Sequence, residues 1–213
     1  VPSSRSAKLW SAEVETATEQ TNKPPEEVRK PARTNNVPLA SGFIVKPGFK
    51  IELVAESPVV ASPVAMAFDE RGRLFVVEMR DYPGRRNTTP HLGRVRLLED
   101  PDGNGTFKTS TVFAEDLALP SGLACFKGGV FVAAAPDIFY FKDNDGNGIA
   151  EERKPVLTGF GDTNTPSSDR SVNSLVWGPD FRIHGLASGL GGRITVDGAA
   201  QEGSLYLGRN DFS

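Results

Sequence analysis

The chain has 213 residues, 38% of them hydrophobic, which is enough to bury the core of one large domain or two small ones. The formal net charge is −3 and the basic residues are dispersed, so the sequence excludes a cationic surface for nucleic acid. The 22 glycines and 16 prolines favour short strands joined by turns over a helical bundle. No run approaches the roughly 18 consecutive apolar residues of a membrane-spanning helix, so no transmembrane segment is expected.

Residues 1–41 are predicted to form an N-terminal extension or linker. Apolar residues between positions 7 and 20 form only a thin stripe, which predicts a weak, partial helix. The residues that follow place prolines among charged side chains, a composition typical of an extended linker. The chain starts at Val1 and stops at Ser213 without a terminating pattern, so we expect a fragment of a longer protein.

Residues 42–213 have the pattern of a β-rich domain. Residues 64–77 contain two β-type runs separated by a turn sequence, which predicts a hairpin. The same pattern returns at residues 122–135 and 173–186. Further strand-like runs follow the first two hairpins, at residues 95–98, 110–114, 138–141 and 155–158. The domain therefore repeats a unit made of a hairpin and additional strands.

The corresponding hairpin positions Leu74, Val130 and Ile183 lie 56 and 53 residues apart. Four short strands in a unit of this length are typical of a β-propeller blade. We therefore predict an all-β fold, a partial β-propeller of about three blades of four short antiparallel strands, preceded by an extended and partly helical N-terminal segment. Three blades do not close a propeller, which also favours a fragment. The alternative is an irregular β-sandwich whose hairpins resemble one another by chance.

The acidic loop at residues 143–151 is a candidate calcium site. Asp143, Asp145 and Asn147 alternate along it and Glu151 follows at the ninth position, so four side-chain oxygens are available to a hard cation such as Ca²⁺. No amphipathic helices flank the loop and its twelfth position is not Glu, which excludes an EF-hand. The alternative is a hydrogen-bonded turn that needs no metal.

A similar loop at residues 100–105 fits calcium less well. Asp100, Asp102 and Asn104 hold the matching positions, but Lys108 stands at the ninth position. A cationic side chain there makes this loop a weaker metal candidate.

Two polar segments beside predicted strands are candidates for substrate binding. Arg80 and Asp81 follow directly on a strand, and Arg170 and Asn173 precede or open the third hairpin. Charged residues at strand ends often line the face of a β-fold, so we predict that these four residues contact a ligand. The alternative for the first segment is a solvated loop with an internal arginine–carboxylate pair.

The histidines and the cysteine suggest no catalytic centre on their own. His91 and His184 have no second ligand at metal-like spacing, which favours structural or surface roles. The single cysteine, Cys125, lies in an apolar run and is predicted to be a buried core residue. The sequence contains no glycine-rich phosphate loop and no hydrolase or zinc-protease motif.

An ordered series of motifs extends from PGFKIELVA at residues 47–55 to GRNDF at residues 208–212. Between them stand PVAMAFD, VEMRDYP, RLLED, APDI and LVWGPD, at residues 63–69, 77–83, 96–100, 135–138 and 175–180. This series resembles the membrane-bound dehydrogenase domain that is abundant in planctomycete-type bacteria. The resemblance implies a β-propeller related to soluble quinoprotein glucose and sorbosone dehydrogenases, in a protein that is exported to the periplasm.

Relatives of this kind oxidise a sugar or polyol with pyrroloquinoline quinone and Ca²⁺, use a histidine as base, and pass electrons to a c-type haem domain. The resemblance therefore implies a dehydrogenase-like function, but this chain departs from the pattern. It has no Cys-x-x-Cys-His motif, so haem c is not expected in it, and residues 169–173 lack the histidine of the relatives. We therefore assign no catalytic base. The alternative is a non-catalytic, calcium-stabilised β-propeller that binds carbohydrate or protein.

Overall fold

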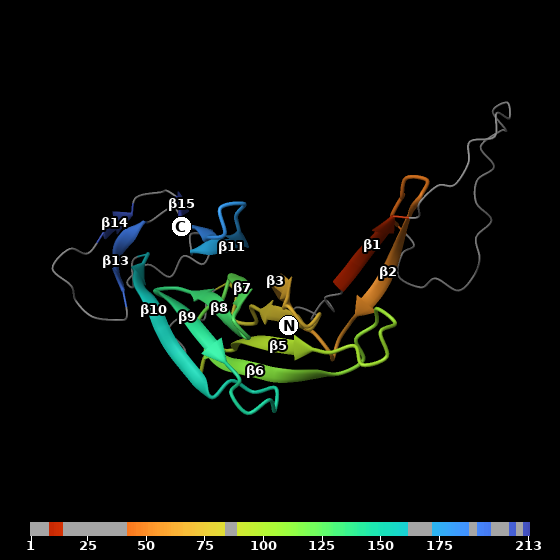
Figure 1. Ribbon diagram of the computed structural model, residues 1–213, viewed down its shortest axis with the longest axis horizontal. Helices are drawn as coiled ribbons and strands as arrows, with labels where there is room; N and C mark the ends of the chain where they lie inside the picture. The colour runs from red at the N-terminus through yellow and green to blue at the C-terminus, as the bar shows by residue number, and fades with distance from the viewer. Residues whose placement is uncertain are drawn as a thin grey trace, which may run out of the picture.

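The computed structural model describes residues 9–14, 42–83, 89–161, 172–187, 191–196, 205–207 and 211–213. Every regular element in these ranges is a β-strand; the strands pair in antiparallel sheets, and none of the sheets closes into a barrel (Figure 1). The predicted all-β fold class is therefore confirmed. Across these ranges the chain contains no helix with the length and apolar character needed to cross a membrane.

The first sheet contains four consecutive strands in chain order: β3 (Pro63–Phe68), β4 (Leu74–Glu78), β5 (Gly93–Leu98) and β6 (Ser110–Leu117). The β3–β4 turn forms because the Asp69 carboxylate accepts hydrogen bonds from the Arg71 and Arg73 N–H groups, at 3.0 and 2.8 Å. All five residues of β4 are buried. This strand is therefore covered on both faces.

The second sheet starts with four consecutive strands: β7 (Gly122–Phe126), β8 (Gly129–Ala134), β9 (Asp137–Lys142) and β10 (Glu152–Phe160). The later strands β13 (Gly192–Val196) and β14 (Leu205–Leu207) extend it beyond β10 to six strands. The third sheet contains β11 (Asn173–Trp177), β12 (Ile183–Leu186) and β15 (Asp211–Phe212). The predicted four-strand unit thus describes the first sheet fully. After the third hairpin, by contrast, β13 pairs with β10 and β14 pairs with β13, so both strands join the second sheet.

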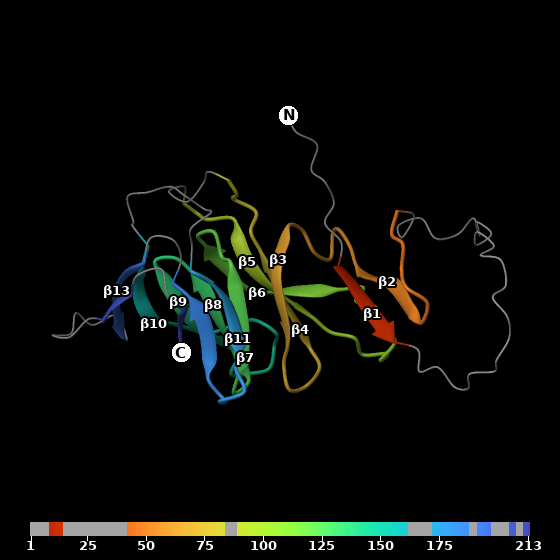
Figure 2. The ribbon, with the colours of Figure 1, turned by 90° about the horizontal axis from the view of Figure 1, so that it is seen from above.

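The first strands of the three sheets, β3, β7 and β11, lie side by side and run in the same direction (Figure 2). At their carboxyl ends, Trp177 Nε1 donates a hydrogen bond to the Cys125 carbonyl at 3.0 Å, and Cys125 Sγ lies 4.0 Å from the Ala67 carbonyl. At their amino ends, Gly122 packs against the backbone at the start of β11. We refer to β3, β7 and β11 as the inner strands.

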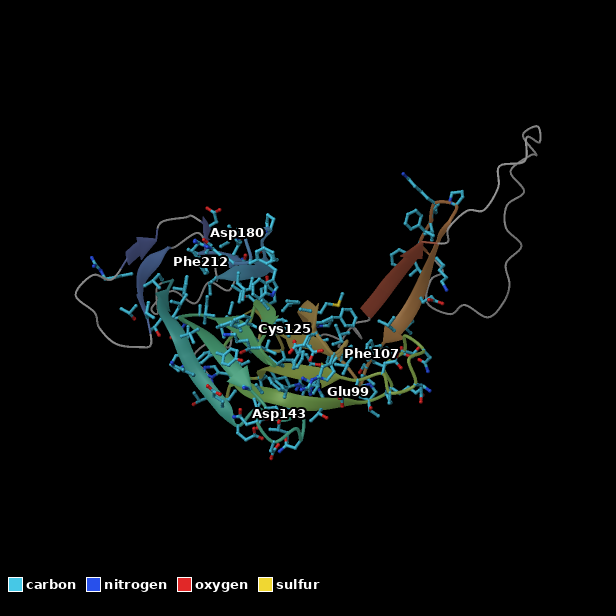
Figure 3. All side chains as sticks on the ribbon, in the orientation of Figure 1. Glu99, Phe107, Cys125, Asp143, Asp180 and Phe212 are labelled. Atoms are coloured by element: carbon cyan, nitrogen blue, oxygen red, sulfur yellow. The ribbon has the colours of Figure 1, made fainter. Side chains whose placement is uncertain are left out.

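Two apolar cores separate the three sheets. The core between the first and second sheets contains Phe75 and Phe113, whose rings meet edge to face at 4.9 Å, and also Phe141. Cys125 lies in this core, as predicted (Figure 3). The core between the second and third sheets includes Phe160, which is fully buried. Both sides of the second sheet are therefore packed against a neighbouring sheet.

The strands β1 (Leu9–Val14) and β2 (Phe49–Ala55) form a separate two-stranded antiparallel sheet (Figure 1). The helix predicted within residues 7–20 is wrong where the structure describes that segment, because residues 9–14 are extended and Val14 pairs with Phe49. A thin apolar stripe supports a helix only weakly, so backbone pairing with a distant strand outweighs it. The predicted linker at residues 15–41 lies outside the described residues.

Candidate functional site

The amino ends of the inner strands form a continuous edge that brings two predicted ligand-binding segments together. The Leu119 N–H donates a hydrogen bond to Asp81 Oδ2 at 3.4 Å. Two residues later, the Ser121 hydroxyl donates to the carbonyl of Val172, which directly precedes Asn173. We term this edge the inner rim. The segment of residues 119–121 thus contacts both Asp81, after β4, and Val172, which precedes Asn173 at the start of β11.

The Asp81 carboxylate is buried at the inner rim. Its side chain is 1% exposed, and Oδ1 has no hydrogen-bond partner among the residues that the structure describes. A buried carboxylate oxygen without a partner is costly, so it offers a strong acceptor for a hydroxyl group or a water molecule. Arg80 beside it is exposed and Asn173 is half-buried. The fourth predicted residue, Arg170, lies outside the described residues.

A buried ion cluster that we did not predict supports the inner rim from within the first sheet. Glu78 is fully buried, accepts a hydrogen bond from Arg94 Nε, and lies 3.6 Å from Arg96 Nε. The Ala61 N–H donates to its other oxygen at 2.7 Å. Burial lowers the pKa of Arg96, and the neighbouring positive charge of Arg94 lowers it further. The only signal in the sequence was a glutamate at the end of an apolar strand, which does not reveal its partners.

Both histidines form pairs with aspartates away from the inner strands of the rim. His91 Nδ1 lies 2.9 Å from Asp116 Oδ1, beside the outer strands β5 and β6. His184 Nε2 lies 2.9 Å from Asp180 Oδ1, at the turn between β11 and β12, opposite the inner rim. Hydrogen bonds from His91 lower the pKa of Asp116, and the hydrogen bond with His184 lowers that of Asp180. Neither imidazole therefore stands beside Asn173.

The acidic loop gathers three of its four predicted ligands. Asp143, Asp145 and Glu151 each direct a carboxylate oxygen into one group whose atoms lie within 4.8 Å of one another. Gly146 and Gly148 donate their N–H groups to the two oxygens of Asp143, at 2.6 and 2.8 Å. Burial raises the pKa of Asp143, but these backbone hydrogen bonds outweigh it, so the pKa is lowered overall. The carboxylate is therefore held in its charged form.

The fourth predicted ligand, Asn147, faces the group with its nitrogen. Its Nδ2 donates to Asp145 Oδ2 at 3.0 Å and to Glu151 Oε1 at 3.2 Å, while its Oδ1 accepts from the Ile149 N–H at 2.7 Å. The amide hydrogens of Asn147 thus bridge Asp145 and Glu151 and weaken the repulsion between these two acids in this conformation. The three carboxylates supply hard oxygen donors of the kind that Ca²⁺ takes.

The weaker loop at residues 100–105 is arranged as a simple turn. Asp100 accepts hydrogen bonds from the Asn104 and Gly105 N–H groups, at 3.2 and 2.6 Å. Asp102 Oδ2 lies 4.0 Å from Lys108 Nζ. The cation that made this loop a poor metal candidate therefore pairs with one of its acids.

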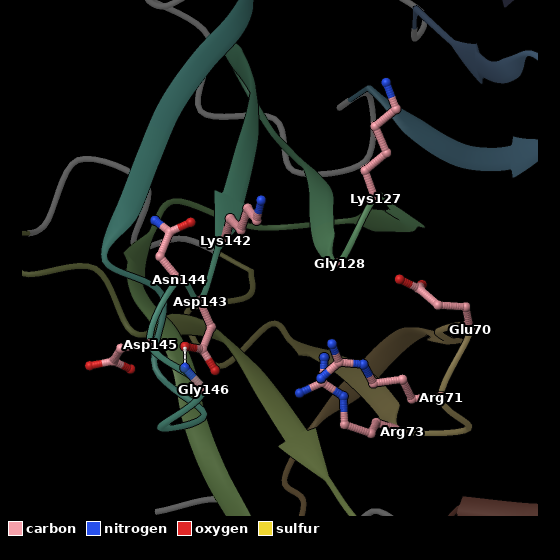
Figure 4. Close-up of a pocket in the computed structure, with 10 residues that line it drawn as sticks. All are labelled: Glu70, Arg71, Arg73, Lys127, Gly128, Lys142, Asp143, Asn144, Asp145 and Gly146. Atoms are coloured by element: carbon pink, nitrogen blue, oxygen red, sulfur yellow. Dashed lines mark hydrogen bonds between the residues drawn. The ribbon is translucent and has the colours of Figure 1, made fainter.

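A cleft of about 480 Å³ lies next to the acidic loop (Figure 4). Its walls come from the β3–β4 turn, the β7–β8 turn and the acidic loop, and include Arg71, Lys127, Lys142 and Asp143. Figure 4 shows the Arg71 side chain reaching from the β3–β4 turn toward the side on which Asp143 stands. Sequence reasoning missed the cleft because these turns are far apart along the chain.

These features define a protein of stacked antiparallel sheets with a polar inner rim and an acidic loop at residues 143–151 that gathers three carboxylates. The chain belongs to the family described as Domain of unknown function (DUF7133), whose model matches residues 39–213. No curated protein and no solved structure matches the chain.

Proposed function

We propose that this chain is the N-terminal propeller portion of an exported, dehydrogenase-like protein that oxidises a sugar or polyol. Neighbouring inner strands from three successive sheets are the arrangement expected of propeller blades around an axis. The order of motifs from residue 47 to residue 212 supports the dehydrogenase relationship. Electrons would pass to a c-type haem domain that is not in this chain.

The observation that carries the proposal is Oδ1 of Asp81 at the inner rim, which is buried and has no hydrogen-bond partner within the described part of the chain. A hydroxyl group that donates to this oxygen would satisfy it, and polyols carry many such donors. Arg80 supplies an exposed cation beside it, and Asn173 supplies an amide on the neighbouring sheet. In this proposal these residues, with Arg170, orient the substrate.

The cofactors enter the proposal by resemblance. Ca²⁺ fits Asp143, Asp145 and Glu151, which would hold it with carboxylate oxygens and stabilise the loop. Pyrroloquinoline quinone would accept the electrons of the substrate. The described residues of the inner rim include no histidine, so we assign no proton-transfer step to this chain.

The test uses the purified full-length protein. Quinone and Ca²⁺ are titrated while reduction of a redox dye is followed with a panel of aldoses and polyols. We expect reduction with at least one of them, and an increase of about tenfold or more in KM for Arg80→Ala. The matched control is Arg71→Ala, an exposed arginine at the other end of the same hairpin. Asp81→Asn is a second variant, and its fold is checked by thermal unfolding.

The second candidate function is a non-catalytic, calcium-stabilised propeller that binds carbohydrate or protein. The placement of both histidines in aspartate pairs away from Asn173 favours it, because the described rim then lacks a base. Saccharide binding in calorimetry without any dye reduction would support this function over oxidation.

A further inference from the structure

The cleft of about 480 Å³ beside the acidic loop lies at the opposite end of the inner strands from the inner rim. Its walls are the turns that follow β3 and β7 and the loop that follows β9. The two turns approach each other closely, because a β-carbon added to Gly128 would lie 3.9 Å from Glu70 Oε1. Sites for small molecules have volumes of roughly 300–1,000 Å³. The cleft is therefore large enough for a ligand of its own.

The carboxylates on the loop side of the cleft already have hydrogen-bond donors within the loop. Both oxygens of Asp143 accept N–H groups from the glycines of the loop. Both oxygens of Asp145 accept hydrogen bonds from Asn147, one from its N–H and one from its Nδ2, each at 3.0 Å. Neither aspartate forms an ion pair with a cation of the cleft among the residues that the structure describes. The loop thus satisfies its own acids.

Two of the four cations that line the cleft remain available to a ligand. Arg73 pairs with Asp69 at 2.8 Å, and Lys127 lies over a neighbouring phenylalanine ring, with Nζ 5.0 Å from its centroid. Arg71 is exposed and Lys142 is half-buried, and in the described ranges neither pairs with a carboxylate. In Figure 4, Arg71 comes from the β3–β4 turn and Lys142 from the opposite side of the cleft. An anionic group in the cleft would therefore meet an available cation on each side.

The lining of the cleft also indicates the charge and the polarity of its ligand. Four cations and three carboxylates line it, so the lining has a net charge of +1. A single carboxylate would balance this charge and would accept charge-assisted hydrogen bonds from a guanidinium and an ammonium group. Glu70 and Asn144 are exposed and carry side-chain oxygens that can accept hydrogen bonds from hydroxyl groups. These features favour an anion that also carries hydroxyl groups.

We propose that this cleft binds a hydroxylated monocarboxylate, such as a sugar acid, with its carboxylate between Arg71 and Lys142. The hydroxyl groups of the ligand donate hydrogen bonds to Glu70 and to Asn144 Oδ1. This second site is separate from the inner rim and requires neither the oxidation chemistry nor the metal of the proposed function. Neutral aldoses and polyols lack the charge that the cleft recognises, so Arg71→Ala remains a control in the dye assay.

The test measures binding to the full-length protein by isothermal titration calorimetry. The protein is first treated with a chelator and desalted, so that bound Ca²⁺ does not contribute. The probes are glucuronate, glucose and acetate, because glucose lacks the carboxylate and acetate lacks the hydroxyl groups. We expect glucuronate to bind at least about tenfold more tightly than either of the others. Its affinity should fall as salt is added, since the charges of the cleft are accessible to solvent.

Arg71→Ala should weaken glucuronate binding at least about tenfold, and Lys142→Gln should weaken it similarly. The matched control is Arg182→Ala, which removes an exposed arginine from the corresponding turn of the third hairpin, away from the residues that line the cleft. Thermal unfolding checks the fold of each variant. Because Arg71 is exposed, its replacement should leave the Tm within about 2 °C of wild type.

Equal affinities for glucuronate and glucose would overturn the proposal, because the cations would then not recognise the carboxylate. Equal affinities for glucuronate and acetate would also overturn it, since the hydroxyl groups would not be recognised. An unchanged affinity in Arg71→Ala, or an equal loss in Arg182→Ala, would place the binding outside this cleft. Failure of dye reduction would leave the calorimetric result intact, so the two proposals fail separately.

Discussion

The carboxylate of Glu78 on β4 accepts a hydrogen bond from the guanidinium group of Arg94, directly opposite on β5. The carboxylate is fully buried, and its second oxygen accepts the Ala61 N–H. A one-residue slip between β4 and β5 would separate the charges and leave both without partners inside the protein. The ion pair therefore specifies the register of the first sheet.

We expect Glu78→Gln to destabilise the protein by about 3–5 kcal/mol, because it leaves two partly buried arginines without their shared carboxylate. Urea denaturation measures the change. The control is Glu52→Gln, which removes an exposed carboxylate 3.3 Å from Lys50 and should cost less than about 0.5 kcal/mol. Similar losses in the two variants would contradict the assigned role of Glu78.

Asp143→Ala should destabilise the acidic loop by about 1–2 kcal/mol, because the N–H groups of Gly146 and Gly148 lose a charged acceptor. The pKa of Asp143 is lowered in the folded state, so its contribution is fully present above the unfolded-state pKa and is lost as pH falls through the folded value. The difference in unfolding free energy between wild type and variant should therefore be constant near neutral pH and shrink below about pH 4. A difference that grows on acidification would refute this account.

Calcium at a hundred times its dissociation constant should stabilise the protein by about 2.7 kcal/mol, a rise in Tm of roughly 5–10 °C. Asp145→Asn combined with Glu151→Gln should abolish the rise, because two of three carboxylate ligands are lost. Asp102→Asn, in the loop at residues 100–105, should leave the calcium-dependent rise in Tm unchanged. Differential scanning fluorimetry with added Ca²⁺ and with a chelator measures the rise in Tm for each variant. If Ca²⁺ still raises the Tm of the double variant, the assignment of the calcium site to this loop is wrong.

Cys125 should be almost unreactive in the native protein. Burial raises the pKa of its thiol to about 12, with a smaller contribution from the Asp69 charge. At pH 8 we expect reaction with an aromatic disulfide reagent at least about a hundredfold slower than for an exposed cysteine. In urea the thiol should react at the normal rate. Fast labelling of the folded protein would show that the core between the first two sheets opens readily.

Gly93→Ala should be strongly destabilising, by roughly 2–3 kcal/mol, because a β-carbon there would collide with the Leu117 carbonyl and the Pro120 ring. Gly42 provides the matched control, since nothing lies within 4 Å of an added β-carbon. Gly42→Ala should be close to neutral in thermal unfolding. Equal effects would mean that the start of β5 shifts to make room.

The hairpins and the acidic loop could be predicted from the sequence because local chemistry determines them. Alternating apolar residues and the Asp69–Gly72 turn specify β3 and β4 within a few positions, and the same holds for β7 with β8. The loop carboxylates Asp143, Asp145 and Glu151 lie within nine positions of one another, so spacing alone places them together. In each case the interacting groups are close along the chain.

Only the tertiary structure decided the contacts between distant segments. β1 became a strand because β2 offered it backbone partners, and β13 joined the second sheet because β10 had a free edge. The hydrogen bond that Asp81 accepts comes from Leu119, which is 38 positions away, and the charge partners of Glu78 depend on the register of β5. The packing of the sheets determines such contacts. A local sequence pattern does not specify which distant atoms will pack against a side chain and exclude water from it.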